Sequence, residues 1–494
     1  MSLDAYQKLL ERAREVYLLH SAAGTLQWDA ETYLPPKAVP FRAEQLSFLE
    51  ARAHLLATDK QVGDWIKACE DHGSPADSDE AANVREWRRE YDRATKLPVS
   101  LVEEFERTCA LARDDWKRAR RDSDFAAFAP QLGKIMDLTR RRAELWGYKE
   151  SPYDALLEGF EPGMTTRTLQ PVFAELRASL VEILAQIRGE SVPENFLKGD
   201  YPIPGQQALN QRIAMAFGYD FDGGRVDTTT HPFQTSLGPD DHRITTRYDE
   251  QMFLVSFYGV LHETGHALYE QGLRKEAVGT PIGSARSLGI HESQSRLWEN
   301  HVGRSLSFWQ KWHSTACEHL PDLRRYSPED ITRGAQRVAP TFIRVEADEV
   351  TYDLHILLRF EIEVALIEGK LEVKELPAAW NSKFRDLLGL VVPTDSLGVL
   401  QDIHWSLGSF GYFPTYSLGN LNAAQLMRAA ERQVPGLQSR LAAGDYAPLL
   451  DWLRTNIHRA GQKYLSSELM TRATGEPTQA KYRIEYLRKK YLRG

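Results

Sequence analysis

The sequence has few cysteines, no long apolar run and no excess of basic residues. Its three cysteines, Cys69, Cys109 and Cys317, stand far apart and match no metal-ligand spacing, which argues against a disulfide framework and favours a reducing compartment. No run of about 18 apolar residues is present, so no membrane-spanning helix is expected. The formal net charge of −8 gives no excess of positive charge of the kind that nucleic-acid-binding proteins carry. We therefore expect a soluble cytoplasmic protein that binds neither membranes nor nucleic acids.

Several signals of other functions are also missing. The sequence contains no G-x-S-x-G nucleophile elbow and no Gly-rich phosphate loop. Charged residues run throughout positions 1–19, which therefore lack the apolar core of a signal peptide. The one basic run, "YLRKKYLRG" at 486–494, is expected to form the solvent-exposed face of a last helix rather than a nucleic-acid or membrane contact.

Helical periodicity dominates what is present. Apolar residues recur at three- and four-residue spacing over 3–22, 42–72, 78–120, 124–147, 166–189, 343–369, 376–389, 422–433 and 446–459. "SPED" at 327–330 is a helix start. Strand character is concentrated in 225–248, with a turn at 238–241. Because the breaks between segments are short, we predict one large, mostly α-helical unit rather than three domains.

The motif "HETGH" at 262–266 carries the strongest chemical signal. On a helix His262 and His266 project from one face, and Glu263 lies between them in the chain. This H-E-x-x-H spacing is that of zinc hydrolases, in which the histidines bind the metal and the glutamate acts as base. The alternative is a buried helix whose two imidazoles hydrogen-bond to backbone or carboxylates. A buried polar group needs such a partner.

A catalytic zinc usually has three protein ligands and a water molecule. Glu292, in "GIHESQSRLWEN", begins a new helical run after a Gly/Pro-broken loop. A second helix folding back antiparallel would bring this carboxylate to His262 and His266. The neighbouring His291 points about 100° away on the helix, so we expect it at most to support a metal ligand and not to bind the metal itself.

The motifs that follow one another along the chain make the sequence similar to the thermostable (Taq-type) zinc metallocarboxypeptidases. They are "LQWDAETYLPP" at 26–36, "HPF" at 231–233, "DHRIT" at 241–245, "HETGH" at 262–266, "HES" at 291–293, "IRVEAD" at 343–348, "GVLQDIHW" at 398–405 and "GYFPTYSLGN" at 411–420. This resemblance implies release of C-terminal amino acids from peptides with broad preference, by a homodimer that uses Zn²⁺, with Co²⁺ able to substitute.

For the fold, the resemblance implies a single mostly helical domain over 1–494 with a deep substrate groove and a small β-sheet beside the metal. Helices of residues 1–160 would form a groove wall, and 225–420 would carry the catalytic motifs. A departure from the wider group of thermolysin-like sites concerns Arg296, four residues after Glu292. Related zinc peptidases often have an aspartate there that supports a ligand histidine, so in this chain the supporting group must come from elsewhere.

Peptide hydrolysis requires further groups beside the metal. We expect Glu263 to take the proton of the attacking water and to pass it to the leaving amine. The segment from His404 to Tyr416 can approach a metal closely because of its glycines. By analogy with related zinc peptidases, His404 and either Tyr412 or Tyr416 would stabilise the oxyanion, unless the tyrosines are simply core aromatics.

A free substrate carboxylate calls for a cation, and arginine suits it through bidentate geometry. Arg344 is the first candidate and Arg243 the second, although Arg344 could instead pair with Asp348 on the same helix. His231, placed on the strand segment, could bond the substrate backbone, and the strand edge could align an extended peptide. A plain strand histidine is the alternative.

Two other functions stay open at this point. A dipeptidyl carboxypeptidase or oligo-endopeptidase with the same metal site is favoured if Arg344 is buried in an ion pair far from the metal. An inactive helical scaffold that binds peptides is the alternative from another class, although such a protein has no need of Glu263. The substrates expected for the leading hypothesis are peptides with a free C-terminal carboxylate.

Overall fold

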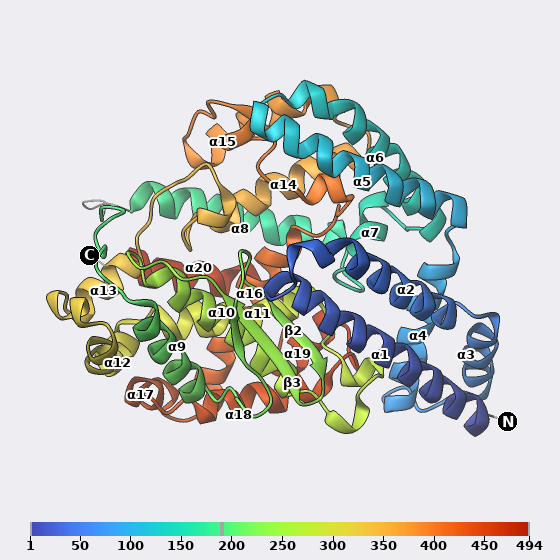
Figure 1. The fold of residues 1–494 in the computed structure, drawn as a ribbon, viewed down its shortest axis with the longest axis horizontal. Coiled ribbons are helices and arrows are strands. Elements are labelled where there is room, and N and C mark those ends of the chain that lie inside the picture. Colours follow the sequence, from blue (N-terminus) through green and yellow to red (C-terminus); the bar gives the residue numbers. More distant parts are fainter. Residues whose placement is uncertain (1, 188–191, 493–494) are drawn as a thin grey trace.

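The computed structural model describes residues 2–187 and 192–492, and helices make up most of it. Four helices open the chain (Figure 1): α1 (Ser2–Thr32), α2 (Val39–Ala57), α3 (Lys60–His72) and α4 (Asp79–Thr95). The predicted helices over 42–72 and 78–120 are thus each divided. Asp59 starts α3 by accepting a hydrogen bond from the backbone of Gln61, and Pro98 precedes α5. Such caps and prolines favour a helix start over a continued helix.

The remaining helices surround two apolar cores. They are α5 (Val99–Asp122), α6 (Phe125–Trp146), α7 (Pro152–Leu157), α8 (Thr166–Gln186), α9 (Ile203–Phe217), α10 (Leu254–Gln271), α11 (Leu288–Arg296), α12 (Leu306–His319), α13 (Pro328–Ala335), α14 (Tyr352–Ile367), α15 (Leu376–Leu388), α16 (Pro414–Gln433), α17 (Leu437–Ala443), α18 (Ala447–Asn456), α19 (Ser466–Thr474) and α20 (Ala480–Tyr491). In the described residues, no helix has the length and apolar character to cross a bilayer.

Helix α16 belongs to both cores. Leu418 and Leu421 pack into the core formed mainly by α5–α8, α14 and α15, while Ala423 and Leu426 pack into the core formed mainly by α9–α12 and α17–α19. Figure 1 shows α16 between these two groups of helices. One helix therefore ties the two halves of the molecule together.

Helix α14 begins at Tyr352, nine residues later than the predicted start at 343. Asp348 accepts hydrogen bonds from the backbone amides of Val350 and Thr351, which supplies acceptors just ahead of the helix. Arg344 lies instead in a short 3₁₀ turn, Arg344–Glu346. The alternative considered for Arg344, pairing with Asp348 on one helix, therefore does not apply.

The small predicted sheet is present, with strands β1 (Val226–Thr228), β2 (Gln234–Gly238) and β3 (Asp241–Thr246) in the order β1-β3-β2. β2 and β3 are antiparallel and joined by a tight turn, whereas β1 runs parallel to β3. The sheet packs against α10, and Ser21 of α1 donates a hydrogen bond to the carbonyl of Leu237 in β2. The first helix and the motif helix are thus held against one sheet (Figure 1).

Candidate metal centre and active site

Two histidines on α10 and one glutamate on α11 meet inside the molecule. His262 Nε2 lies 3.5 Å and His266 Nε2 lies 3.3 Å from Oε2 of Glu292. Ligand atoms of the three side chains lie within 4.8 Å of one another. The three residues that the sequence indicates as metal ligands therefore lie next to one another in the fold.

Two glycines allow α11 to lie between its neighbours. A Cβ at Gly265, inside the H-E-x-x-H motif, would be 2.5 Å from Cα of Ser295 on α11. On the other side, a Cβ at Gly419 of α16 would overlap Cγ of Glu292. Because neither glycine has a side chain, both flanking helices press directly on the segment that carries Glu292.

The carboxylate of Glu292 is held in a defined orientation. Arg296 Nε donates to Oε1 at 2.7 Å, and Ser295 Oγ donates to Oε2 at 3.1 Å. Burial alone would raise the pKa of Glu292, but the positive charge of Arg296 holds that pKa well below its ordinary value. The side chain is therefore an anion whose Oε2 faces the two histidines.

His262 is supported by a carboxylate that the sequence did not reveal. Its Nδ1 lies 3.0 Å from Oε2 of Glu299, so an N–H there donates to the carboxylate and leaves Nε2 free to bind a metal. Arg304 Nη2 donates to Glu299 Oε1 at 2.9 Å, and Arg296 Nη1 lies 3.3 Å from Oε2. Glu299 lies on a seven-residue π-helical segment, Leu297–Gly303, that directly continues α11.

His266 has a different support. Its Nδ1 contacts Nδ1 of His291, and Nε2 of His291 lies 2.9 Å from Oε1 of Glu270. Burial, together with the adjacent His291, lowers the pKa of His266 to about 3, so the ring is neutral near pH 7. His291 thus contacts a ligand candidate and is placed to support it, in agreement with the expectation.

The donor set fits a divalent metal of the Zn²⁺ or Co²⁺ type. Two imidazole nitrogens and one carboxylate oxygen are the ligands found in many catalytic zinc sites. Each histidine also has a partner at its second nitrogen, which fixes the ring orientation in such sites.

Glu263 follows His262 on α10 and is 7% exposed. Burial raises the pKa of its carboxyl group to about 7, an effect that His262 opposes. A carboxyl group with a pKa close to neutrality can exchange a proton in either direction at physiological pH.

The tyrosines predicted near the metal lie close to Glu292. Tyr412 and Tyr416 have ring centroids 5.4 Å apart, and burial together with the charge of Glu292 raises the pKa of both phenols. Tyr416 lies in the first turn of α16 rather than in a loop. The ring of His404 packs on Tyr412 at 5.3 Å, and burial lowers the pKa of His404 to about 4.

A buried glutamate that the sequence analysis missed anchors this segment. Glu363 on α14 accepts hydrogen bonds from the indole of Trp405 at 2.8 Å, the amide of Gly411 at 3.1 Å and the hydroxyl of Tyr153 at 2.7 Å. Glu363 lies 42 residues before Trp405 in the chain, so local sequence spacing does not indicate this contact.

Arg344 is 5% exposed and belongs to a buried charge cluster. Its Nε and Nη2 donate to Oδ1 of Asp402 at 3.1 and 2.9 Å, and Asp402 also accepts from Arg359. Nη1 of Arg344 donates to the hydroxyl of Tyr352, whose ring lies under the guanidinium of Arg296. Arg344 is therefore buried in an ion pair, yet it is linked to Glu292 through two side chains.

The other two predicted substrate contacts, Arg243 and His231, lie on the sheet and in a loop beside it, respectively. Arg243 of β3 forms a bidentate pair with Asp241 and stacks on Trp28 of α1. His231 is exposed and lies in the bend between β1 and β2, so its predicted place on a strand is wrong. A cavity of about 400 Å³ is bordered by Arg296, Glu299 and residues 345–349.

The similarity of the chain to known proteins extends over nearly its whole length. Residues 8–491 match the model of the family described as carboxypeptidase Taq (M32) metallopeptidase. "Thermostable carboxypeptidase 1" of Thermus thermophilus is 45% identical, with 99% of this chain and 98% of that protein covered. "Carboxypeptidase 1" of Bacillus subtilis is 36% identical, with 99% of both covered.

Solved structures of similar proteins have the same fold. The crystal structure of an M32 carboxypeptidase from Deinococcus radiodurans R1 superposes with a TM-score of 0.96 at 38% identity, covering 99% of both chains. Metallocarboxypeptidase 1 of Trypanosoma cruzi gives 0.95 at 35% identity, with the same coverage. The helices that surround His262, His266 and Glu292 are thus those of a known peptidase fold, and the chain belongs to the carboxypeptidase Taq (M32) family as a metallocarboxypeptidase.

Proposed function

We propose that this enzyme uses Zn²⁺ to release single amino acids, with broad preference, from peptides that have a free C-terminal carboxylate. His262, His266 and Glu292 would hold the metal. The observation that carries this proposal is the convergence of their ligand atoms within 4.8 Å. When bound, the metal supplies Lewis-acid polarisation of a carbonyl and lowers the pKa of a water molecule to about 7. Co²⁺ would suit the same donors.

Glu263 is proposed as the general base. Its burial and its pKa of about 7 support transfer of a proton from water to the carboxylate and then to the leaving amine. The buried position also keeps bulk water from competing for the proton. Glu292, whose pKa is held far lower, remains an anion throughout and cannot take this role.

Tyr412 and Tyr416 are proposed as donors to the substrate carbonyl oxygen as negative charge develops there. Their raised pKa values keep both hydroxyls protonated. Neutral His404, in contact with Tyr412, would orient that phenol or donate to the substrate directly.

Recognition of the substrate carboxylate is proposed to depend on Arg344. Two arginines, Arg344 and Arg359, share one aspartate, Asp402, so this cluster carries an excess positive charge. Three N–H groups of Arg344 donate within the protein, which leaves two for an incoming carboxylate. Arg243 is the second candidate and His231 a backbone contact at the sheet.

One observation favours the second candidate function, an oligo-endopeptidase or dipeptidyl carboxypeptidase. Arg344 is buried and ion-paired, which would make it a structural residue if substrate could not reach it. Its link to Glu292 through Tyr352 and Arg296 supports the carboxypeptidase instead. The deep groove, the homodimer, the single domain and the cytoplasmic location stay predictions.

The test uses one N-blocked peptide in two forms, with a free and an amidated C-terminus. Each is incubated with metal-loaded and chelator-stripped enzyme, and the products are identified by mass spectrometry. Stepwise loss of single residues from the free acid alone, and only with metal, is the expected result. Equal cleavage of the amide or internal cuts would favour the endopeptidase, and bound metal without any cleavage would favour the inactive peptide-binding scaffold.

A further inference from the structure

The π-helical segment Leu297–Gly303 leaves one backbone carbonyl without a helical partner. The amide of Arg304 donates to the carbonyl of Glu299 at 3.0 Å, five residues back, and the amide of Ser305 donates to Val302 at 3.2 Å. These are the amides that would otherwise serve the carbonyl of Asn300. A buried carbonyl without a partner costs free energy, so another donor is required.

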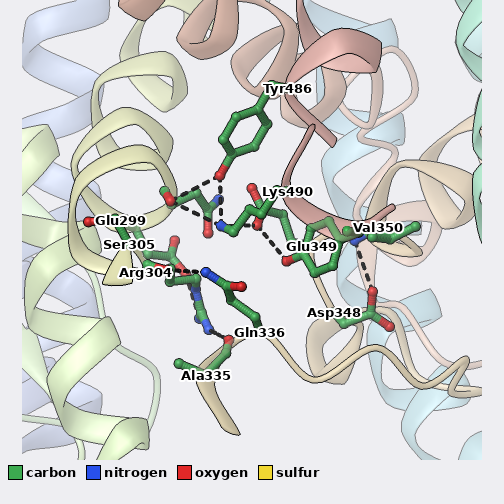
Figure 2. A network of polar contacts seen from close by, with 12 residues as sticks. Glu299, Arg304, Ser305, Ala335, Gln336, Asp348, Glu349, Val350, Tyr486 and Lys490 are labelled. Carbon is green, nitrogen blue, oxygen red and sulfur yellow. Dashed lines mark hydrogen bonds and ion pairs between the residues drawn. The ribbon is translucent and has the colours of Figure 1, made fainter. Parts of the chain in front are cut away.

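Helix α20 supplies the missing donors. The hydroxyl of Tyr486 and Nζ of Lys490 donate to the carbonyl oxygen of Asn300 at 3.0 and 3.2 Å. Lys490 also donates to the Tyr486 hydroxyl at 2.7 Å (Figure 2). The ring of His301 stacks on Tyr486 with a centroid separation of 3.9 Å. Tyr486 and Lys490, on the last helix, thus hold the segment that carries Glu299 by hydrogen bonds.

These donors are themselves fixed. Glu349 accepts from Lys490 Nζ at 2.7 Å, from Tyr491 at 2.8 Å and from Arg483 at 3.0 Å, as Figure 2 shows for Lys490. The side chains of Lys490 and Glu349 are only 10% and 4% exposed. Of the basic run at 486–494, Arg488 and Lys489 are exposed as predicted, but Lys490 faces inward; residues 493–494 lie outside the described residues.

We propose that α20 is a positioning element of the metal centre, in which Tyr486 and Lys490 hold the Asn300 carbonyl and so fix the π-helical segment that presents Glu299 to His262. Neither residue touches a proposed metal ligand. Both reach the π-helical segment through the carbonyl of Asn300, and Tyr486 also through the ring of His301. Glu299 can hold His262 only while its carboxylate stays 3.0 Å from Nδ1. Loosening the π-helical turn moves this carboxylate and weakens the support of the imidazole.

The proposed role of α20 rests on the proposed metal centre, and its loss should lower metal affinity by a predictable factor. Removing a carboxylate that supports a ligand histidine typically costs about 10- to 100-fold in metal affinity. We therefore expect Lys490→Met to raise the metal dissociation constant by about 10-fold. Tyr486→Phe, which removes one hydroxyl and keeps the ring on His301, should act in the same direction, and Lys490→Arg should restore affinity.

The experiment measures the affinity of apo-enzyme for Zn²⁺ by competition with a chromophoric chelator, and the visible spectrum of the Co²⁺ form. Lys489→Met is the matched control, because Lys489 is exposed on the same helix. Glu299→Gln is combined with Lys490→Met in a double-mutant cycle. If α20 acts through Glu299, Lys490→Met should weaken binding strongly in the native background and little in the Glu299→Gln background.

The outcomes separate the two proposals. Wild-type enzyme that binds no metal would overturn the metal centre itself. Wild-type enzyme that binds metal, with Lys490→Met and Tyr486→Phe equal to Lys489→Met, would overturn only the role of α20. Losses that add fully in the double mutant would also overturn it, because they would show a route that bypasses Glu299. Should Lys490→Met fail to fold, Tyr486→Phe and its double mutant with Glu299→Gln decide the question.

Discussion

Gly419 of α16 lies so close to Glu292 of α11 that any side chain at 419 would overlap the side chain of the proposed metal ligand. The helix that joins the two cores is therefore also the wall behind Glu292. The contact between Gly419 and Glu292 therefore affects both the packing of α16 and the position of the proposed ligand.

Replacing this glycine should damage both properties. Gly419→Ala is expected to destabilise the protein by about 1–3 kcal/mol, because a methyl group is forced into a filled space. It should also weaken metal binding by displacing Glu292. Urea unfolding and chelator competition measure the two effects.

Gly133 in the middle of α6 offers the control, since an added Cβ there meets nothing within 4 Å. Gly133→Ala should stabilise the protein by about 0.5–1 kcal/mol, because alanine favours a helix over glycine. Equal responses at the two positions would contradict the contact between Gly419 and Glu292.

Removal of the proposed base should separate metal binding from turnover. Glu263→Gln keeps the shape of the side chain but cannot accept a proton, so kcat should fall by about 10²- to 10⁴-fold. Metal content, measured by atomic emission, should remain at the wild-type level. His262→Ala should lose both metal and activity. A Glu263→Gln enzyme within a few-fold of wild-type kcat would exclude the base role.

The charge of Arg344 should matter only for substrates with a free carboxylate. Arg344→Met is expected to lower kcat/KM for the free-acid peptide by about 10- to 100-fold, the value of one charged hydrogen-bonded pair. Any slow cleavage of the amidated peptide should change little. Parallel losses on both peptides would assign Arg344 to structure through Asp402. Arg243→Met, measured in the same way, tests the second candidate.

Glu161 should make stability depend on pH. This carboxyl group is 1% exposed, and its Oε1 accepts a hydrogen bond from the amide of Gly289 at the start of α11. Burial raises its pKa from 4.5 to about 7. The folded state therefore holds a proton that the unfolded state releases, so this stability is present below pH 4.5 and is lost as pH rises through about 7.

The variant Glu161→Gln has no such proton to lose. Relative to wild type, its free energy of unfolding should increase between pH 5 and pH 8, by up to about 3 kcal/mol. Chemical denaturation at several pH values measures the difference. Glu175→Gln, at an exposed position of α8, is the matched control. A flat result for Glu161→Gln would contradict the raised pKa.

The positions of His262 and His266 could be predicted from the sequence, because helix geometry puts residues four apart on one face. Glu292 could be predicted because it begins the next helical run after the motif. The resemblance to the family supplied the mostly helical fold with its small sheet. Glu299 could not be found this way, since its role depends on a π-helical segment that changes the register after Arg296. Hydrophobic periodicity carries no signal for a widened turn of seven residues.

Long-range pairs were equally out of reach. Arg344 pairs with Asp402, 58 residues further along the chain, whereas local spacing pointed to Asp348. Asp348 instead supplies acceptors at the start of α14, which is why the helix begins late. Helix breaks at Asp59 and Pro98 did have signals, a capping residue and a proline, inside segments that periodicity alone had joined.

The position of α16 in both cores has a consequence during synthesis. On the ribosome α10 and α11 emerge long before α16, and until then Glu292 has no wall behind it and the two cores have no common helix. A nascent chain that already contains every proposed metal ligand is therefore still an incomplete enzyme. Both the wall behind Glu292 and the helix shared by the two cores are complete only after α16, which ends at Gln433, has been synthesised.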